Sequence, residues 1–264
     1  MPRAATISSS ANPLVKDVRR AIERRGLTSQ GWCVAETFHL LEEALRDAQV
    51  QQVLAAESAR DAALARLGAY PGVPLAVLPD RLFRTVSATE TSQGVLALVR
   101  LPGRACYGLP ALIVVLDGLQ DPGNAGAIVR AAEAFGATGA IFLKGAASPY
   151  NPKTLRASAG SLFRVPFLHA ADPVEVRDAL DGNRIARYAA VPPRPGAPAR
   201  PLSATDLAGD CALIVGSEAR GVSPALASGA IEVSIPTTGV ESLNAAVAAG
   251  ILLYEASRRR SAPR

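Results

Sequence analysis

The chain has 264 residues, of which 49% are hydrophobic and 19% charged, so it is long enough for one or two folded domains. This composition excludes a disordered chain, which would carry more charge and less apolar material. The net charge of +5 comes from 28 basic and 23 acidic residues, and 25 of the basic residues are arginines. Because guanidinium groups suit phosphates, the charge keeps a polyanion partner under consideration without establishing one.

The cysteines and the apolar runs argue against disulfide, metal and membrane chemistry. Cys33, Cys106 and Cys211 are odd in number and lack CxxC spacing, so they predict neither a disulfide framework nor a zinc site, and Cys33 and Cys211 are expected to be buried. No signal peptide is recognisable, and the longest apolar run, Ala245–Tyr254, is well short of the ~20 residues that a membrane span needs. We therefore expect a cytoplasmic protein that binds no metal and no membrane.

The first hundred residues alternate between predicted helices and strands. Leu14, Val18 and Ile22 recur at helical spacing and predict a helix that ends near Gly26. The elements that follow are a strand over 32–35, a helix over 38–48, a strand over 50–55, a helix over 58–67, and strands over 75–78 and 94–99. This alternation favours a small α/β sandwich over residues 1–100.

Proline and glycine punctuate residues 101–109, which we interpret as a linker to a second domain over 110–264. The second domain opens with an unalternating aliphatic run, 111–116, which is typical of a strand covered on both faces. Strands are then predicted over 140–143, 185–191, 212–215 and 231–235, and helices over 125–135, 154–161, 174–180 and 243–258. This order predicts a parallel sheet with crossover helices, and the proline-rich stretch 192–201 predicts an exposed loop.

Ligands of open α/β sheets gather outside the carboxyl ends of the strands, which makes three loops candidate sites. The first runs from Asp117 to Arg130 and enters a helix that Asn124 could cap. Apolar residues adjoin Arg130, and a buried guanidinium there would have to be paired. The loop lacks GxGxxG spacing, and the chain has no GxxxxGK[ST] phosphate loop. Taken alone, this loop also fits ordinary turn and capping chemistry.

The second loop follows the strand over 212–215. Gly216 and Gly221 flank Glu218 and would let the backbone approach a ligand closely. A GxExxG pattern by itself also fits an ordinary turn.

The third loop joins the strand over 231–235 to a helix. It contains Ile235, Gly239, Ser242, Leu243 and Asn244, so two small hydrogen-bonding side chains precede the helix amides. One of these side chains could simply be the helix cap.

Together, in this order and spacing, the three loops resemble the signature motifs of the SpoU (TrmH-like) RNA ribose 2′-O-methyltransferases of the SPOUT superfamily. The matching segments are Asn124-x-Gly126-Ala127-Ile128-x-Arg130, Leu213-Ile214-Val215-Gly216-Ser217-Glu218-x-x-Gly221, and Ile235-Pro236 through Gly239 to Ser242-Leu243-Asn244. The resemblance covers residues 110–258. It implies a parallel-sheet SPOUT domain with a deep trefoil knot, and a homodimer with its sites near the subunit interface.

The N-terminal part is similar to the small RNA-binding domain that many relatives carry. The similarity rests on Asn12-Pro13-Leu14-Val15-Lys16, on Val34-Ala35-Glu36, and on Thr89-Glu90-Thr91-Ser92-Gln93-Gly94-Val95. Thr37 stands where those relatives usually have glycine. In the third motif, Thr237-Thr238 and Ala245-Ala246 replace residues that are more often methionine or another apolar residue and Val-Ser.

The resemblance implies transfer of a methyl group from S-adenosylmethionine to a ribose 2′-hydroxyl of RNA. Cofactor binding would fall to Gly216, Gly221, Ile235, Gly239 and Leu243. The acceptor would be surrounded by Asn124, Arg130, Glu218, Ser242 and Asn244. A guanidinium with a pKa above about 12 is a poor base, so we expect Arg130 to clamp the adjacent phosphate or stabilise the developing alkoxide, with Glu218 holding it in place.

Two further arginine clusters have alternative interpretations. The cluster Arg19, Arg20, Arg24 and Arg25 would engage RNA phosphates, or it is a solvated helix face. The run 258–260 is a basic tail near RNA or a favourable helix C-terminus.

Several functions remain to be distinguished. By family analogy the substrate is large-subunit (23S) ribosomal RNA, and the alternatives are transfer RNA or a non-catalytic RNA-binding module of the same fold. A nucleotide-dependent oxidoreductase is disfavoured because Gly118 and Gly123 do not provide the required spacing. A housekeeping role and a role in antibiotic resistance are both open.

Overall fold

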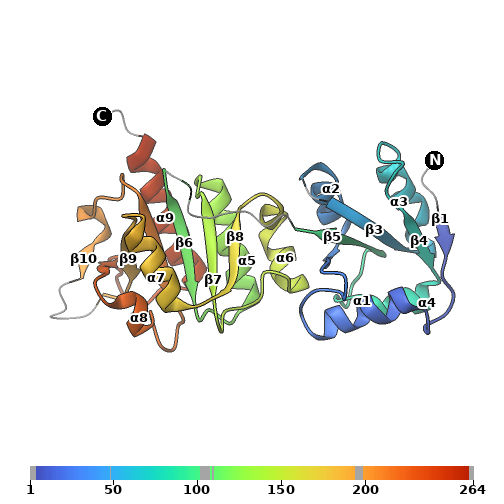
Figure 1. Ribbon diagram of the computed structural model, residues 1–264, viewed down its shortest axis with the longest axis horizontal. Helices are drawn as coiled ribbons and strands as arrows, with labels where there is room; N and C mark the ends of the chain where they lie inside the picture. Colours follow the sequence, from blue (N-terminus) through green and yellow to red (C-terminus); the bar gives the residue numbers. More distant parts are fainter. Residues whose placement is uncertain (1–3, 48, 102–107, 109, 194–198, 262–264) are drawn as a thin grey trace. The chain divides into compact units, whose positions relative to one another are not determined.

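The computed structural model describes residues 4–47, 49–101, 108, 110–193 and 199–261, and contacts group the chain into two compact units (Figure 1). The first unit comprises Met1–Pro102 and Tyr150–Arg164, and the second comprises Gly103–Pro149 and Val165–Arg264. The predicted linker over 101–109 lies largely outside the described residues, so that boundary stays a prediction. Segment 150–164 thus packs with the first unit, although its sequence lies within the predicted second domain.

A five-stranded mixed sheet forms the centre of the first unit, in the order β1-β4-β3-β5-β2. These strands are β1 (Ala4–Thr6), β2 (Cys33–Glu36), β3 (Gln49–Ala56), β4 (Leu75–Leu78) and β5 (Val95–Arg100). Helices α1 (Pro13–Glu23) and α4 (Asp80–Phe83) lie on one side, and α2 (Phe38–Asp47) and α3 (Arg60–Leu67) lie on the other (Figure 1). The predicted α/β sandwich is confirmed, whereas β1 and α4 were not predicted.

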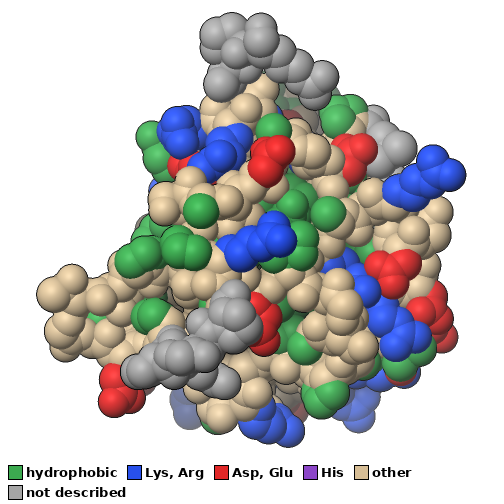
Figure 2. Space-filling view, turned by 90° about the vertical axis from the view of Figure 1, so that its left-hand side faces the viewer, with side chains coloured by type: hydrophobic (Ala, Val, Ile, Leu, Met, Phe, Trp, Pro, Cys, Tyr) green, Lys and Arg blue, Asp and Glu red, His purple; other side chains and the backbone are tan. Residues whose placement is uncertain are grey.

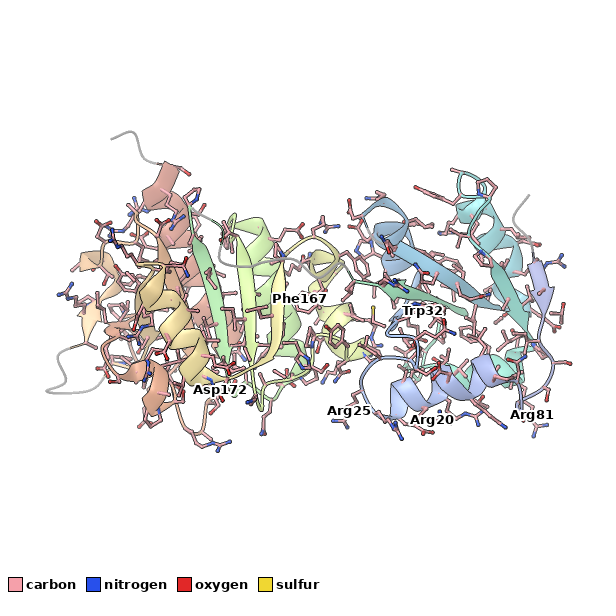
Figure 3. All side chains as sticks on the ribbon, viewed as in Figure 1. Arg20, Arg25, Trp32, Arg81, Phe167 and Asp172 are labelled. Atoms are coloured by element: carbon pink, nitrogen blue, oxygen red, sulfur yellow. The ribbon has the colours of Figure 1, made fainter. Side chains whose placement is uncertain are left out.

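Helix α1 begins where a cap and a proline favour it. The Asn12 side chain accepts a hydrogen bond from the Leu14 amide at 2.9 Å, and proline occupies the first turn. The apolar stripe of Val15, Val18 and Ala21 is buried against the core that Leu82, Phe83 and Val86 also enter. The opposite face is exposed, and Arg20 and Arg25 project from it away from the sheet (Figure 3).

The end of β2 is organised by a buried carboxylate. Glu36 is 1% exposed and accepts four hydrogen bonds of 2.5–2.8 Å from residues 87–92. The next residue, Thr37, has a φ of +126°, a conformation that favours glycine. Its hydroxyl accepts a hydrogen bond from the Leu40 amide at 3.1 Å, so threonine offsets this strain by capping α2.

Segment 150–164 is held to the first unit by helix packing and ion pairs. Helix α6 (Pro152–Ser158) packs against β2, which is an edge strand of the sheet. Arg164 contacts the Glu43 and Asp47 carboxylates at 2.6 and 2.7 Å, and Arg156 lies 3.9 Å from Glu36. These cations balance the acidic side chains of β2 and α2.

The second unit contains a parallel seven-stranded sheet in the order β10-β12-β9-β11-β6-β7-β8. Its strands are β6 (Leu112–Asp117), β7 (Gly139–Leu143), β8 (Phe167–Ala171), β9 (Ala186–Ala190), β10 (Arg200–Pro201), β11 (Cys211–Gly216) and β12 (Ile231–Ser234). Its helices are α5 (Pro122–Ala134), α7 (Pro173–Gly182), α8 (Pro224–Ala227) and α9 (Ala245–Ser261). The predicted parallel α/β sheet is confirmed, and the trefoil knot stays a prediction.

Side chains alternate across this sheet. Ile113, Val115 and Ile214 point to one face and share a core with Val176 of α7 and Leu226 of α8. Helices α5 and α9 pack together, α5 contacting β7 and α9 contacting β11. The central strands are therefore covered on both faces, as their unalternating apolar sequences indicate.

Three elements of the second unit were not predicted: β8, β10 and α8. The expectation that residues 192–201 form only a loop was wrong at its end, because Arg200–Pro201 pairs with β12 as an edge strand. Proline is compatible with such an edge, where its missing amide leaves no partner unsatisfied. Figure 2 shows basic and acidic side chains interspersed on the surface around this edge.

A buried arginine, Arg187, links three elements of the second unit. Arg187 is 8% exposed, pairs with Asp181 at 2.8 Å, and donates to the carbonyls of Leu226 and Ser228 at 2.8 and 2.9 Å. It therefore joins β9 to α7 and to the end of α8, and its charge is fully compensated. No sequence motif indicates this role.

The arginines that end α9 make structural contacts. Hydrogen bonds from Arg258, and then from Arg259, hold the pKa of Glu255 at about 2. Arg260 donates to the backbone carbonyls of Ala111 and Gly209. These contacts favour the helix-terminus interpretation of residues 258–260 over a basic tail.

The predicted burial of Cys33 and Cys211 is confirmed, and Cys106 lies outside the described residues. Burial raises the pKa of the Cys33 thiol to about 12. Among the helices that the structure describes, none is long and apolar enough to cross a membrane.

Candidate functional site

The three candidate loops meet at the carboxyl edge of the second sheet. They follow β6, β11 and β12, and β9 lies between β11 and β12 in the sheet. Because all these strands are parallel, the loops emerge from the same edge.

A chain of side-chain hydrogen bonds joins the three loops. The Asn124 Nδ2 donates to Glu218 Oε1 at 3.0 Å, and the Asn244 Nδ2 donates to Asn124 Oδ1 at 3.1 Å. Asn244 Oδ1 in turn accepts from the backbone amides of Ala246 and Val247, so this residue also caps α9. Three predicted acceptor-site residues from distant parts of the sequence are thus brought together.

The cap of α5 differs from the prediction. Asp121 is the N-cap, and its Oδ1 accepts a hydrogen bond from the Asn124 amide at 2.7 Å. The expectation that Asn124 caps the helix was therefore wrong, and α5 begins three residues earlier than predicted, at Pro122. This arrangement leaves the carboxamide of Asn124 available to bridge Glu218 and Asn244.

The structure explains why positions 216 and 221 are glycines. The loop folds back on itself, with the Gly221 amide donating to the Ser217 carbonyl at 2.8 Å. A Cβ added at Gly216 would overlap the backbone of Gly221 and Val222, and Gly221 itself has a φ of +67°. The close approach at Gly216 is thus to the chain's own backbone, and it shapes the wall of the adjoining pocket.

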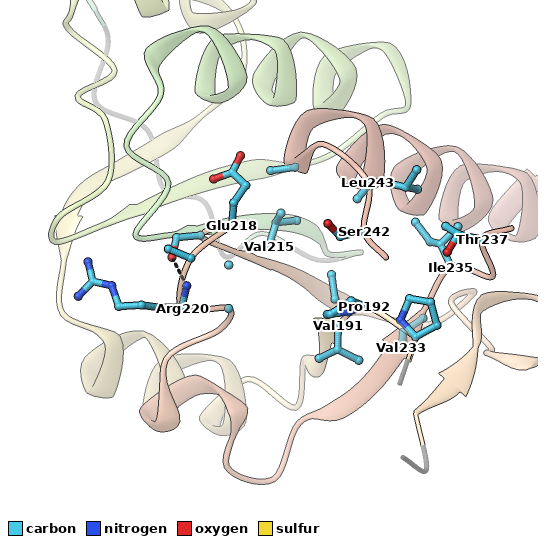
Figure 4. Close-up of a pocket in the computed structure, with 18 residues that line it drawn as sticks. Val191, Pro192, Val215, Glu218, Arg220, Val233, Ile235, Thr237, Ser242 and Leu243 are labelled. Atoms are coloured by element: carbon cyan, nitrogen blue, oxygen red, sulfur yellow. Dashed lines mark hydrogen bonds between the residues drawn. The ribbon is translucent and has the colours of Figure 1, made fainter. Parts of the chain in front are cut away.

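A pocket of about 260 Å³ lies beside this network (Figure 4). Six of the predicted site residues line it: Gly216, Glu218, Gly221, Ile235, Ser242 and Leu243. Gly239, predicted to bind the cofactor, is not among the lining residues and occupies a turn with a φ of +80°. The pocket combines apolar side chains with one carboxylate (Glu218), one guanidinium-bearing residue (Arg220) and the hydroxyl-bearing residues Ser217, Thr237 and Ser242.

One wall of the pocket was missed. Residues 190–193, at the carboxyl end of β9, line the pocket opposite the third loop. Their prolines were interpreted only as loop punctuation. Strand order would have identified them, because the end of a strand between two site-bearing strands must lie at the same edge, but that order is known only from the structure.

Arg130 does not lie in this pocket. It is exposed on α5, and its side chain makes no hydrogen bond or ion pair with any other described residue. The expectation of a buried, paired guanidinium was wrong, and Glu218 bonds to Asn124 rather than to Arg130. Helix geometry explains the error, because Ala127, Arg130 and Ala134 form one exposed stripe while their sequence neighbours face inward.

The predicted RNA-binding arginines divide into two groups. Arg20, Arg24 and Arg25 are exposed. Arg19 is partly buried and donates to Thr85 Oγ1 at 2.7 Å and to the Thr85 carbonyl at 3.4 Å. Its guanidinium thus fastens α1 to the short helix that begins at Arg84.

The pocket fits a ligand with an apolar or aromatic body, and its rim offers amide and carboxylate groups to a hydroxyl. Ser242 lies at this rim, and the Thr237 hydroxyl donates to the Val240 carbonyl at 2.9 Å. Within the described part of the chain, no group of three His, Cys, Asp or Glu residues is arranged to hold a metal ion.

Comparison with known families gives two matches. Residues 111–254 match the SpoU rRNA Methylase family, and residues 12–97 match the MRM3-like substrate binding domain. The two matches together cover both halves of the chain.

Individual relatives match over nearly the whole length. The chain is 32% identical over 251 residues to the Bacillus subtilis 23S rRNA (guanosine(2553)-2'-O)-methyltransferase RlmP, covering 94% of this chain and 97% of the relative. A solved RNA 2'-O ribose methyltransferase is 32% identical, with a TM-score of 0.78 over 97% of this chain and 99% of that one. The SpoU methyltransferase AviRb from Streptomyces viridochromogenes, in complex with AdoMet, is 27% identical, with a TM-score of 0.77 over 94% and 99% of the two chains.

Proposed function

Because the chain belongs to the SpoU rRNA methylase family, we propose that it transfers a methyl group from S-adenosylmethionine to a ribose 2′-hydroxyl of large-subunit (23S) ribosomal RNA. The observation that carries this proposal is the hydrogen-bonded chain Glu218–Asn124–Asn244 at the rim of the pocket. Ribosomal RNA is favoured over transfer RNA because the Bacillus subtilis relative named for 23S rRNA matches both units. A cytoplasmic location fits this substrate.

The pocket suits an adenosine-bearing cofactor. Ile235 and Leu243 supply apolar walls, and the folded-back loop between Gly216 and Gly221 offers backbone groups. S-adenosylmethionine, when bound, supplies an activated methyl group. The protein therefore has to align the acceptor, exclude water and manage one proton.

The rim residues would perform the alignment. Asn124 holds Glu218 and is itself held by Asn244, and Ser242 lines the same pocket. A pre-oriented set of this kind needs no reorganisation when the ribose hydroxyl arrives.

A homodimer would complete the site. Val247, Ile251 and Tyr254 are 51%, 36% and 54% exposed and share one face of α9, a pattern that fits a subunit contact. Helix α5 lies against α9, with Phe135 and Tyr254 in edge-to-face contact at 5.6 Å. A second copy on this face would bring the exposed Arg130 of one protomer toward the acceptor site of the other.

Asn244 provides a test that separates capping from chemistry. The Asn244→Asp variant keeps an acceptor for the α9 amides but loses the donor to Asn124, so its thermal stability should equal that of the wild type while turnover falls about tenfold. The Asn244→Ala variant should also lose about 1 kcal/mol of stability. Thermal unfolding and steady-state methylation assays measure the two effects, and normal turnover by Asn244→Asp would remove this residue from the site.

The function itself is tested by ligand and product. The purified chain should bind S-adenosylmethionine but not NAD in calorimetry, and ribosomal RNA from cells lacking the gene should lose one ribose methylation. Methylation lost from transfer RNA instead would establish the alternative substrate. RNA binding without S-adenosylmethionine binding would indicate a non-catalytic module.

A further inference from the structure

The first unit carries more basic side chains on its α1 face than the sequence cluster contains. On α1, Lys16, Arg20 and Arg24 are spaced by four residues, so they form one exposed row opposite the buried stripe of Val15 and Val18. Arg25 extends the row past the end of the helix. At 1.5 Å per residue, the eight-residue step from Lys16 to Arg24 gives this row a length of about 12 Å.

Helix α4 and the short helix 84–86 that follows it each add one arginine beside this row. Arg81 and Arg84 are exposed, and Figure 3 shows Arg81 projecting on the same side of the unit as Arg20 and Arg25. The segment is fixed there because Arg19 donates to Thr85 and because α1 packs against residues 84–86. Two segments that lie far apart in the sequence, residues 16–25 and 80–86, thus present one surface.

The charge of this surface is strongly unbalanced. Seven basic residues, counting Arg19, face three acidic ones: Asp17, Glu23 and Asp80. Asp17 accepts hydrogen bonds from the Ser29 amide and hydroxyl, and Ser58 lowers the pKa of Asp80, with Arg84 adding to the effect. Arg20, Arg24, Arg25 and Arg81 have no side-chain hydrogen bond or ion pair with another residue of the described chain.

We propose that one phosphate-binding surface, the α1–α4 basic surface, binds the RNA backbone through Lys16, Arg20, Arg24, Arg25, Arg81 and Arg84. Arg19 positions the segment 80–86 through Thr85 rather than contacting RNA. This inference rests on the proposed function and adds the segment 80–86 to the RNA-binding part. Guanidinium forks suit phosphate oxygens, and a row about 12 Å long can meet more than one phosphate of a strand.

A lipid surface fits these residues less well. A helix that lies on a membrane inserts an apolar face beside its basic one, but the apolar stripe of α1 is buried in the protein core. Leu27 is the large hydrophobic side chain exposed near the row, at 38%. A polyanion that needs no apolar insertion is therefore favoured.

The test measures how RNA affinity depends on salt. The full-length chain is titrated against a fluorescent RNA hairpin of mixed sequence over a series of KCl concentrations. Each lost phosphate contact lowers the slope of log K against log [KCl] by about 0.7–0.9, so Arg81→Ala/Arg84→Ala should lower it by roughly 1.5. The control variant Arg46→Ala/Arg177→Ala also loses two positive charges. Arg46 lies on α2, on the other side of the first sheet, and Arg177 lies on α7. The salt-dependence slope of this control should match that of the wild type.

Thermal unfolding checks each variant, and Arg81→Gln/Arg84→Gln serves if the alanine pair lowers stability. An unchanged slope for the variants at Arg81 and Arg84, or an equal loss in the control, overturns the proposal. The proposal is also overturned if the protein binds phosphatidylcholine–phosphatidylserine vesicles and loses more of this binding than of its RNA binding when Arg81 and Arg84 are replaced.

In methylation assays, the variants at Arg81 and Arg84 should raise KM for RNA and retain kcat. If the wild type shows no methylation but RNA binding still depends on these arginines, the surface stands and the proposed function falls.

Discussion

Replacing Arg130 by alanine is expected to lower the rate of methyl transfer by at least about 100-fold while S-adenosylmethionine affinity stays unchanged. The residue lies outside the pocket, so cofactor contacts do not depend on it. Its exposed guanidinium makes no hydrogen bond or ion pair with the described residues of its own chain, and we assign it to the RNA phosphate or the developing alkoxide. Calorimetry measures the affinity and single-turnover methylation measures the rate. Near-normal methylation by Arg130→Ala would contradict this role of Arg130.

Mixing two inactive variants tests whether Arg130 acts across a dimer. A dimer of one Arg130→Ala protomer and one Glu218→Ala protomer has one intact site only if Arg130 serves the pocket of its partner. Re-equilibrated mixtures should then recover about a quarter of wild-type activity, because about half the dimers are mixed and each has one intact site of two. No recovery would place Arg130 at the pocket of its own chain. Arg130→Lys, which keeps the charge but loses the fork, should stay well below the wild type.

Gly216→Ala is expected to weaken S-adenosylmethionine binding by about 10-fold to 100-fold. The added Cβ meets the backbone of Gly221 and Val222, which cannot rotate away, so the folded-back loop has to move. Overpacking of this kind costs about 1–3 kcal/mol, and both glycines line the pocket. Calorimetric titration gives the affinity directly.

The matched control for this glycine is Gly182→Ala. Gly182 ends α7, and a Cβ there meets nothing within 4 Å. Its S-adenosylmethionine affinity should equal that of the wild type. If Gly216→Ala also binds normally, the folded-back loop is not a rigid wall of the pocket.

The sequence predicted the elements whose burial follows a simple period. The strand β6 is buried along its whole length, and α1 buries residues at helical spacing, so both were recognisable. The edge strands β8 and β10 were missed because β8 is only partly buried and β10 has two residues. Such strands exist through pairing with a neighbour, a tertiary effect that local sequence does not encode.

The candidate site also contains parts that could be predicted from the sequence and parts that could not. Asn124, Glu218 and Asn244 were found because motif order indicated that their loops share a site, and the hydrogen bonds between them agree with this. The exposure of Arg130 was mispredicted because residues adjacent in sequence lie on different faces of a helix. The wall at residues 190–193 was missed because it depends on strand order, which the sequence does not contain.

The packing of segment 150–164 against β2 sets an order of events during synthesis. A ribosome that has released residues up to 102 has not yet supplied α6, Arg156 or Arg164. At about 5–20 residues per second, the missing segment follows on the order of 3–12 s later. During that interval Glu36 and Glu43 lack the cations that later approach them. The nascent first unit is therefore complete only when about a third of the second unit, residues 103–149, has been made. A fragment that ends at the linker corresponds to the incomplete first unit.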